Sequence, residues 1–161
     1  MSSCCGVNVS TYEGRQPALD LRDYFNGPLE AEGVFFNRKG VIQRQFHMEL
    51  TGAWQGNSGT LDEHFIYSNG QKLHRLWKVV MNDDGSFVGS ADDLVGNAIG
   101  RQCGNASNMK YTLKVPKGNK TVAINMDDWL YKVSDAVVIN RVRATKFGFR
   151  VGELFITFRK K

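Results

Sequence analysis

Residues 61–81 read LDEHFIYSNGQKLHRLWKVVM, and this stretch decides the fold. Ser68-Asn69-Gly70 in its middle is typical of a tight turn between two antiparallel strands. Successive side chains of a strand point to opposite faces, so every second residue shares a face. One face of each strand is then mainly apolar: Leu61, Glu63, Phe65 and Tyr67, followed by Leu73, Arg75, Trp77, Val79 and Met81. The stretch predicts a hairpin whose apolar face holds one acidic and one basic side chain.

The same pattern recurs in four further stretches, and each places one or two charged side chains on the face that alternation predicts to be buried. Their predicted inward residues are Ile42, Arg44, Phe46, Met48 and Leu50; Val122, Ile124, Met126, Asp128 and Leu130; Val137, Ile139, Arg141 and Arg143; and Phe149, Val151, Glu153 and Phe155. A charge inside a protein is costly unless it is paired or solvated. Its repetition on six strands, with both signs present, predicts a polar network inside a barrel or against a cavity.

Strands fill almost the whole chain, with short connections between them. We expect them near 29–37, 41–51, 60–68, 72–81, 86–92, 108–116, 120–131, 136–145 and 148–158. Turn residues separate them at Arg38-Lys39-Gly40, Asp83-Asp84-Gly85 and Lys117-Gly118-Asn119, and short connections join antiparallel neighbours. The fold class is therefore all-β, a single antiparallel barrel of about 9–10 strands, with a sandwich as the alternative.

Two other segments complete this organisation. Leu19 to Pro28 (LDLRDYFNGP) predicts a short helical turn that Asn-Gly-Pro ends. The glycine-rich stretch from Gly89 to Asn105 matches no phosphate-binding loop, and we interpret it as turns, bulges or close strand crossings. No linker or repeat interrupts residues 19–161, which we expect to form one barrel domain.

Composition narrows the possible partners. The chain has 161 residues and a net charge of +5. Its Lys and Arg are spread along the sequence rather than clustered with aromatics, so we expect no nucleic-acid partner, although attraction to anionic headgroups stays open. No apolar run approaches the roughly 20 residues that a membrane-spanning helix needs.

The N-terminus resembles a processed lipoprotein. Met1-Ser2-Ser3-Cys4 is similar to the end of a bacterial lipobox, in which small residues precede the lipidated cysteine. Residues 5–18 are polar and fit a flexible tether, so we expect residues 1–18 to be a lipoprotein N-terminus and tether. The alternative is a cytosolic protein with two incidental cysteines at a frayed terminus.

Several blocks together resemble a known family. They are LDLRDYFNG (19–27), GAWQG (52–56), GTLDEHF (59–65), DDLVG (92–96), GNA (104–106), DDWL (127–130), INR (139–141) and KFGFRVGE (146–153). The chain resembles the bacterial lipoprotein family filed as domain of unknown function 3833. The resemblance implies an envelope lipoprotein with a lipocalin-like barrel and supports lipidation of Cys4. It brings no established catalytic residues. With Cys5 rather than Asp after Cys4, we expect the periplasmic face of a Gram-negative outer membrane.

The candidate site consists of the interior charges and one aromatic neighbour. Its predicted residues are Arg44, Glu63, Arg75, Trp77, Asp93, Asp128 and Arg141. In one interpretation they form a buried ion-pair network, because arginine pairs bidentately with carboxylates. In the other, one or two arginines hold the carboxylate or phosphate of a ligand. The two interpretations are compatible.

Other chemistry has weaker support. The pairs Asp62-Glu63, Asp92-Asp93 and Asp127-Asp128 split between opposite strand faces, so they do not predict paired acid–base catalysis. His47, His64 and His74 share the outward faces of their strands, but no ligand spacing supports a metal site. No motif indicates a cofactor or a covalent nucleophile.

Three functions remain from the sequence. The first is a non-enzymatic carrier of a small amphipathic ligand, such as a fatty acid or another lipid. The second is a filled barrel that docks an unknown envelope partner, and the third is a lipid-modifying enzyme. An interior cavity of about 300 Å³ or more with a free arginine favours the first, and a filled interior with an exposed apolar patch favours the second.

Overall fold

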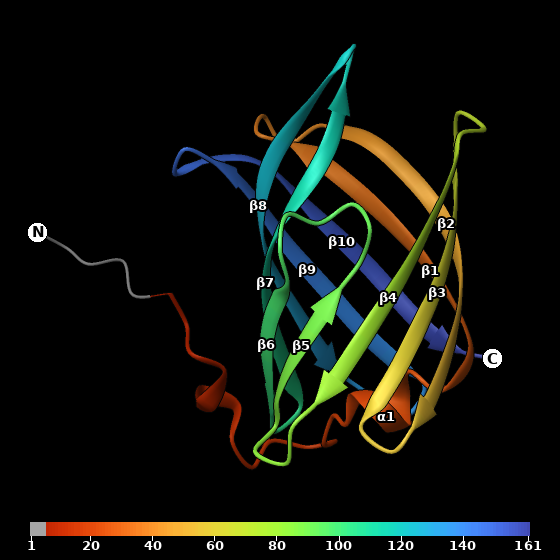
Figure 1. Ribbon diagram of the computed structural model, residues 1–161, viewed down its shortest axis with the longest axis vertical. Coiled ribbons are helices and arrows are strands. Elements are labelled where there is room, and N and C mark those ends of the chain that lie inside the picture. The colour runs from red at the N-terminus through yellow and green to blue at the C-terminus, as the bar shows by residue number, and fades with distance from the viewer. Residues whose placement is uncertain (1–5) are drawn as a thin grey trace, which may run out of the picture.

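The computed structural model describes residues 6–161 and shows a closed barrel. Ten antiparallel strands pair in sequence order, and β1 closes the ring by pairing with β10 (Figure 1). They are β1 (Gly27–Asn37), β2 (Ile42–Gln55), β3 (Ser58–Tyr67), β4 (Lys72–Met81), β5 (Ser86–Ser90), β6 (Ala98–Cys103), β7 (Ala106–Lys117), β8 (Lys120–Lys132), β9 (Val137–Lys146) and β10 (Phe149–Lys160). The prediction of a single all-β antiparallel barrel is confirmed, and the sandwich is excluded.

The predicted turns are found where the sequence places them. Gly40, Gly70, Gly85 and Gly118 each adopt a positive φ, the left-handed conformation that tight strand connections require. The hairpins β1–β2, β3–β4, β7–β8 and β9–β10 all turn at the same end of the barrel, which is the upper end in Figure 1. We call this the open end.

One strand lies in the stretch where the sequence predicted turns, bulges or close strand crossings. β6 (Ala98–Cys103) pairs with β5 and β7 inside the glycine-rich stretch. A Cβ at Gly100 would lie 2.3 Å from the ring of Phe87, so the glycine makes room for that buried side chain. Glycine within a strand often marks such a close approach rather than a turn.

The barrel wall has a gap beside the upper half of β4. Only Lys78 to Met81 of β4 pair with β5, because β5 ends at Ser90. Residues 91–97, which connect β5 to β6, fold across to β7 instead. There Lys114 N donates to Asp93 O at 2.8 Å, and Val95 N donates to Thr112 O at 2.9 Å. This connection therefore covers the part of the wall that the short strands leave unpaired.

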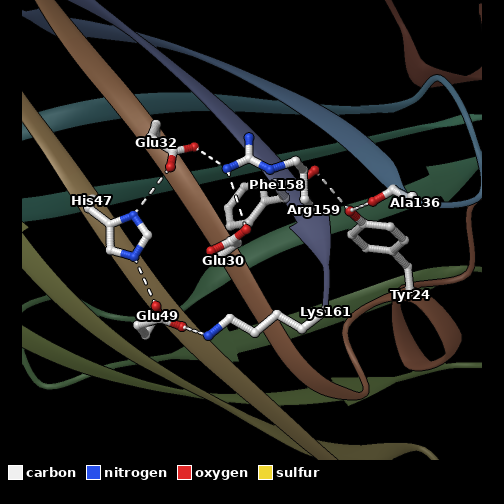
Figure 2. A network of polar contacts seen from close by, with 9 residues as sticks. All are labelled: Tyr24, Glu30, Glu32, His47, Glu49, Ala136, Phe158, Arg159 and Lys161. Atoms are coloured by element: carbon white, nitrogen blue, oxygen red, sulfur yellow. Dashed lines mark hydrogen bonds and ion pairs between the residues drawn. The ribbon is translucent and has the colours of Figure 1, made fainter.

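A short helix, α1 (Leu21–Tyr24), closes the opposite end of the barrel (Figure 1). The Asp20 side chain caps it by accepting from Arg22 N at 3.0 Å. The Tyr24 hydroxyl lies 2.8 Å from the carbonyl oxygen of Ala136 and 3.1 Å from that of Phe158, as Figure 2 shows. The predicted helical turn is confirmed, and we call this the closed end.

The GAWQG block fixes α1 to β2. The Trp54 indole donates to the Phe25 carbonyl oxygen at 3.1 Å. A Cβ at Gly52 would lie 1.5 Å from that same oxygen, so only glycine leaves it space. Gly52 and Trp54 thus hold a single carbonyl from two sides.

Ion pairs cross the seam between β1 and its neighbours on the outer surface (Figure 2). Arg159 of β10 contacts Glu30 and Glu32 of β1, and His47 of β2 lies between Glu32 and Glu49. Hydrogen bonds to Glu49, and then to Glu32, raise the pKa of His47. These pairs are exposed, so each contributes little stability, but together they connect the strands where the barrel closes.

The N-terminal segment differs in part from the expected tether. Val9–Tyr12 forms a short 3-10 helix, η1; Val9 is buried, and Tyr12 packs against Trp129 and Tyr131 on the outside of β8. Cys4 and Cys5 lie outside the described residues, so lipidation of Cys4 stays a prediction, as does the division at residue 18. Among residues 6–161, the helices are too short to cross a membrane.

Replacing Gly52 tests how α1 closes the barrel. We expect Gly52→Ala to lower the free energy of unfolding by about 1–3 kcal/mol, because the new methyl group overlaps the Phe25 carbonyl. The matched control is Ala53→Ser, which changes the adjacent, exposed position. Urea titrations monitored by tryptophan fluorescence measure both, and equal midpoints would contradict this account of the block.

Candidate functional site

A cavity of about 110 Å³ lies inside the barrel, reaching from α1 at the closed end to the level of Arg75. Most of its wall is apolar, with contributions from Met48, Leu61, Trp77 and Leu154. One group of polar side chains interrupts this wall: Glu63, Arg75, Ser107, Tyr111, Asp128 and Asn140. An apolar cavity with a few convergent polar groups is the usual form of a small-molecule site.

Arg75 is the centre of the first polar cluster. Its Nε and Nη2 donate to both carboxylate oxygens of Asp93, at 2.9–3.1 Å. Glu63 lies directly opposite on β3, with its nearest oxygen 3.8 Å from Arg75 Nη1. Although burial opposes it, the hydrogen bonds with Asp93 raise the pKa of Arg75. Asp93 therefore takes the Nε and Nη2 side of the guanidinium, and Glu63 faces Nη1 at ion-pair distance without a hydrogen bond.

Asp128 is the centre of the second cluster, on the far wall. Tyr111 Oη donates to its Oδ2 at 3.0 Å, and Asn140 Nδ2 donates to its Oδ1 at 2.7 Å. Asn140 also donates to the Trp129 carbonyl oxygen at 2.8 Å, which fixes its orientation. Burial raises the pKa of Tyr111 well above its usual value, so this phenol stays a hydrogen-bond donor.

The two interior carboxylic acids both have raised pKa values. Burial raises the pKa of Glu63 to about 7, against the opposing effect of Arg75 and with help from Asp128 and Asp93. Burial likewise raises the pKa of Asp128 to about 6, although the hydrogen bonds from Asn140 and Tyr111 oppose the rise. The pKa of Glu63 stays high because Arg75 is shared with Asp93, which takes the bidentate contact.

The predicted directions of Glu63, Arg75, Trp77 and Asp128 into the barrel are confirmed, and Asp93 joins Arg75 from the connection after β5. Arg44 has the predicted face but lies at the open end. There it is exposed, stacks over the ring of Tyr67 and donates to Gln71 at 3.3 Å. Whether any of these residues binds a ligand stays a prediction.

The predicted inward direction of Arg141 is wrong. The inward residues of β9 are Val138, Asn140, Val142 and Ala144, and Arg141 lies outside, where Nε contacts Glu153 at 2.6 Å. Glu153 was also predicted to face inward, but the register shifts in β10 between Arg150 and Gly152. This bulge reverses the alternation, so Gly152, Leu154, Ile156 and Phe158 face the interior.

The three histidines do not converge on one point. His64 and His74 stack with ring centroids 4.5 Å apart, and both contact Asp62. His47 instead lies with Glu30 and Glu49 on β1 and β2. Hydrogen bonds, first from His74 and then from His64, lower the pKa of Asp62. Because both rings contact the same carboxylate, they lie close together. The structure thus brings together two of the three side chains.

Sequence reasoning missed Tyr111 and Asn140. The six predicted inward faces do not include the strand of Tyr111, and the alternation of residues 137–143 predicts an outward position for Asn140. Their polar side chains beside the hydrophobic residues of INR and MKYTL were the available signal. Both donate hydrogen bonds to the Asp128 carboxylate, and a carboxylate inside a protein requires such partners.

Removing the interior arginine should destabilise the fold. We expect Arg75→Met to cost about 3–5 kcal/mol of unfolding free energy, because Asp93 and Glu63 lose their cationic partner. Arg141→Met, the matched control on the outside, should cost less than about 1 kcal/mol. Chemical denaturation measures both losses, and losses of equal size would contradict the inside and outside assignments.

Glu63 should make stability depend on pH. Between pH 4.5 and about 7 the folded protein retains a proton on Glu63 that the unfolded chain releases. Because the folded state binds more protons, its stability falls as pH rises through this window. Glu63→Gln does not ionise, so its stability relative to the wild type should increase across the window and level off above it. A pH-independent difference in unfolding free energy would contradict a raised pKa.

Comparison with known proteins agrees with the fold and gives no function. No curated protein matches the chain. A solved relative is a protein with unknown function from the DUF3598 family of Nostoc punctiforme, with a TM-score of 0.59 and 12% identity, covering 98% of this chain and 53% of that one. This chain thus spans about half the length of that protein, and the likeness shows the fold alone. The family model described as protein of unknown function (DUF3833) matches residues 1–160, so the chain belongs to that family.

Proposed function

We propose that the barrel binds a small amphipathic molecule in its interior cavity, without catalysis. The supporting observation is the position of two carboxylic acids, the buried Glu63 and the half-buried Asp128, in the polar part of an otherwise apolar wall. The apolar part of the ligand would lie against Trp77, Met48 and Leu154. Its polar head would reach the two acids.

Cavity size limits the ligand. Sites for drug-sized molecules have volumes of about 300–1,000 Å³, whereas this cavity measures about 110 Å³. An engineered apolar cavity of about 150 Å³ holds benzene. A short alkyl chain or a single ring is therefore the appropriate size, and a whole long-chain lipid requires the side chains of the wall to move.

The charges in the cavity favour a head that donates hydrogen bonds. Arg75 is the only basic residue of the cavity wall among the described residues, and Asp93 occupies its fork. Glu63 and Asp128 both accept hydrogen bonds, and above their raised pKa values they are anionic. An amine or an alcohol suits this site better than the fatty-acid carboxylate expected from the sequence, because another anion would meet Glu63 and Asp128 beside an Arg75 that Asp93 and Glu63 already face.

A matched series of hexyl compounds tests the proposal. Hexylamine, hexanol and hexanoate differ only in their heads, and calorimetry at pH 8 measures their binding to the full chain. A hydrogen bond to a charged group is worth about 1.5–3 kcal/mol, so hexylamine should bind roughly ten- to a hundredfold more tightly than hexanoate. Binding of hexanoate as tightly as hexylamine, or no binding in the series, would overturn the proposal.

Adjacent aspartates supply the control. Asp128→Asn should remove most of the preference for the amine, because Asp128 lines the cavity. Asp127→Asn should not, because Asp127 lies on the outer face, where it accepts from Asn108 at 2.7 Å. A preference that both variants retain would place the amine elsewhere on the protein.

A docking module is the second candidate, and two observations favour it. The cavity is small enough for the barrel to count as nearly filled, and large apolar side chains are exposed at the open end. A failure of the whole hexyl series to bind would make this the better account.

A further inference from the structure

The open end of the barrel consists of five connections and the strand residues beside them. We call this surface the rim: residues 37–42, 68–73, 91–97, 114–122 and 145–151. Four of the five segments are hairpins, and the fifth is the connection that covers the gap beside β4. In Figure 1 the four hairpins lie at the upper end, opposite α1, and the connection between β5 and β6 lies below them on the same side of the barrel's middle.

The rim holds the positive charge of the whole chain. It contains eight Lys or Arg residues and two Asp residues, a net charge of +6. Because the chain as a whole carries +5, everything outside the rim amounts to −1. One of the two acids, Asp93, is already paired with Arg75. The molecule is therefore strongly polarised, with one cationic end.

Apolar side chains are exposed among these cations. Phe147 and Phe149 are 85% and 75% exposed, the highest values for large hydrophobic side chains in residues 6–161. Four smaller apolar side chains of the rim are also exposed: Val41, Ile42, Leu73 and Val95. Exposed apolar groups surrounded by basic residues are typical of surfaces that contact membranes.

The backbone of Phe147 provides a second, independent observation. Phe147 and Gly148 form the two-residue turn between β9 and β10, and both have positive φ, 51° and 79°. Such turns favour Asn, Asp or Gly at the first position, and a bulky residue there is unfavourable. Folding therefore does not explain a phenylalanine at this position. Unfavourable backbone conformations of this kind concentrate at functional surfaces.

We propose that the rim docks on the surface of an anionic phospholipid bilayer. Phe147 and Phe149 enter the interface between headgroups and acyl chains, and the surrounding lysines and arginines contact lipid phosphates. Docking removes the two phenyl rings from water, and it brings the net charge of +6 next to anionic headgroups. The proposal concerns the outside of the barrel and does not depend on a ligand in the cavity.

Vesicle sedimentation tests this with the full chain expressed without lipid attached. The probes are vesicles of phosphatidylcholine alone and vesicles that also contain about 30% phosphatidylglycerol. This share of anionic lipid gives a surface potential of physiological order. We expect binding to the anionic vesicles only, weakening as salt is added. The double variant Phe147→Asn/Phe149→Thr should bind roughly tenfold more weakly or worse, because burial of two phenyl rings is lost. Lys117→Gln and Lys120→Gln should each weaken binding about fivefold.

The phenylalanine variants separate docking from folding. Asparagine tolerates a positive φ, so Phe147→Asn should keep or raise the melting temperature while membrane binding falls. Val80→Thr, at an exposed apolar position of β4 outside the rim, is the control and should change neither. Full vesicle binding by the double variant would overturn the proposal. So would equal binding to neutral vesicles. If heparin binds the wild type and the double variant equally well while neither binds vesicles, the rim is a site for an acidic macromolecule instead.

Discussion

The bidentate pair between Arg75 and Asp93 is the interaction on which the rest of this barrel depends. β5 and β6 are too short to complete the wall, so the upper half of β4 has β3 on one edge and no strand on the other. Asp93 crosses that gap from the connection after β5, and its own carbonyl accepts from Lys114 of β7. The ion pair thus joins β4 to β7 through a connection rather than a strand. The same ion pair therefore holds the connection over the gap and balances the charge of Arg75.

The same pair determines the chemistry of the cavity. Asp93 takes the Nε and Nη2 side of the Arg75 guanidinium and Glu63 faces Nη1, so the positive charge is already balanced within the protein. What remains available to a ligand is acidic: Glu63, with a pKa of about 7, and Asp128, with a pKa of about 6. For the proposed ligand, this arrangement favours a hydrogen-bond donor over the anion that the sequence suggested. The difference arises entirely from which charges are already paired.

Local signals predicted much of this structure. Turns such as Ser68-Asn69-Gly70 and alternation over residues 61–81 were sufficient to place Glu63, Arg75 and Trp77 inside a barrel. β6 escaped detection because its glycine serves the packing of Phe87, and a glycine looks the same in a turn. Arg141 was assigned to the wrong face of β9, a regular strand that pairs with β8 without a register shift but buries Asn140 rather than the apolar Ile139. Glu153 was assigned to the wrong face for a different reason. Alternation assigns a face only if the register is unbroken, and a bulge in β10 depends on tertiary pairing that a single strand does not reveal.

The two ends of the barrel satisfy different physical requirements. At the closed end every feature serves burial: Asp20 caps α1, Tyr24 reaches backbone carbonyls, and Gly52 leaves room for one of them. At the open end the chain keeps two phenylalanines in water and accepts a left-handed backbone at Phe147, both of which oppose stability. Unfavourable backbone conformations and exposed apolar side chains concentrate at surfaces that bind a partner. The rim also includes the connection that carries Asp93, so the segment that covers the gap in the wall adjoins the proposed docking surface.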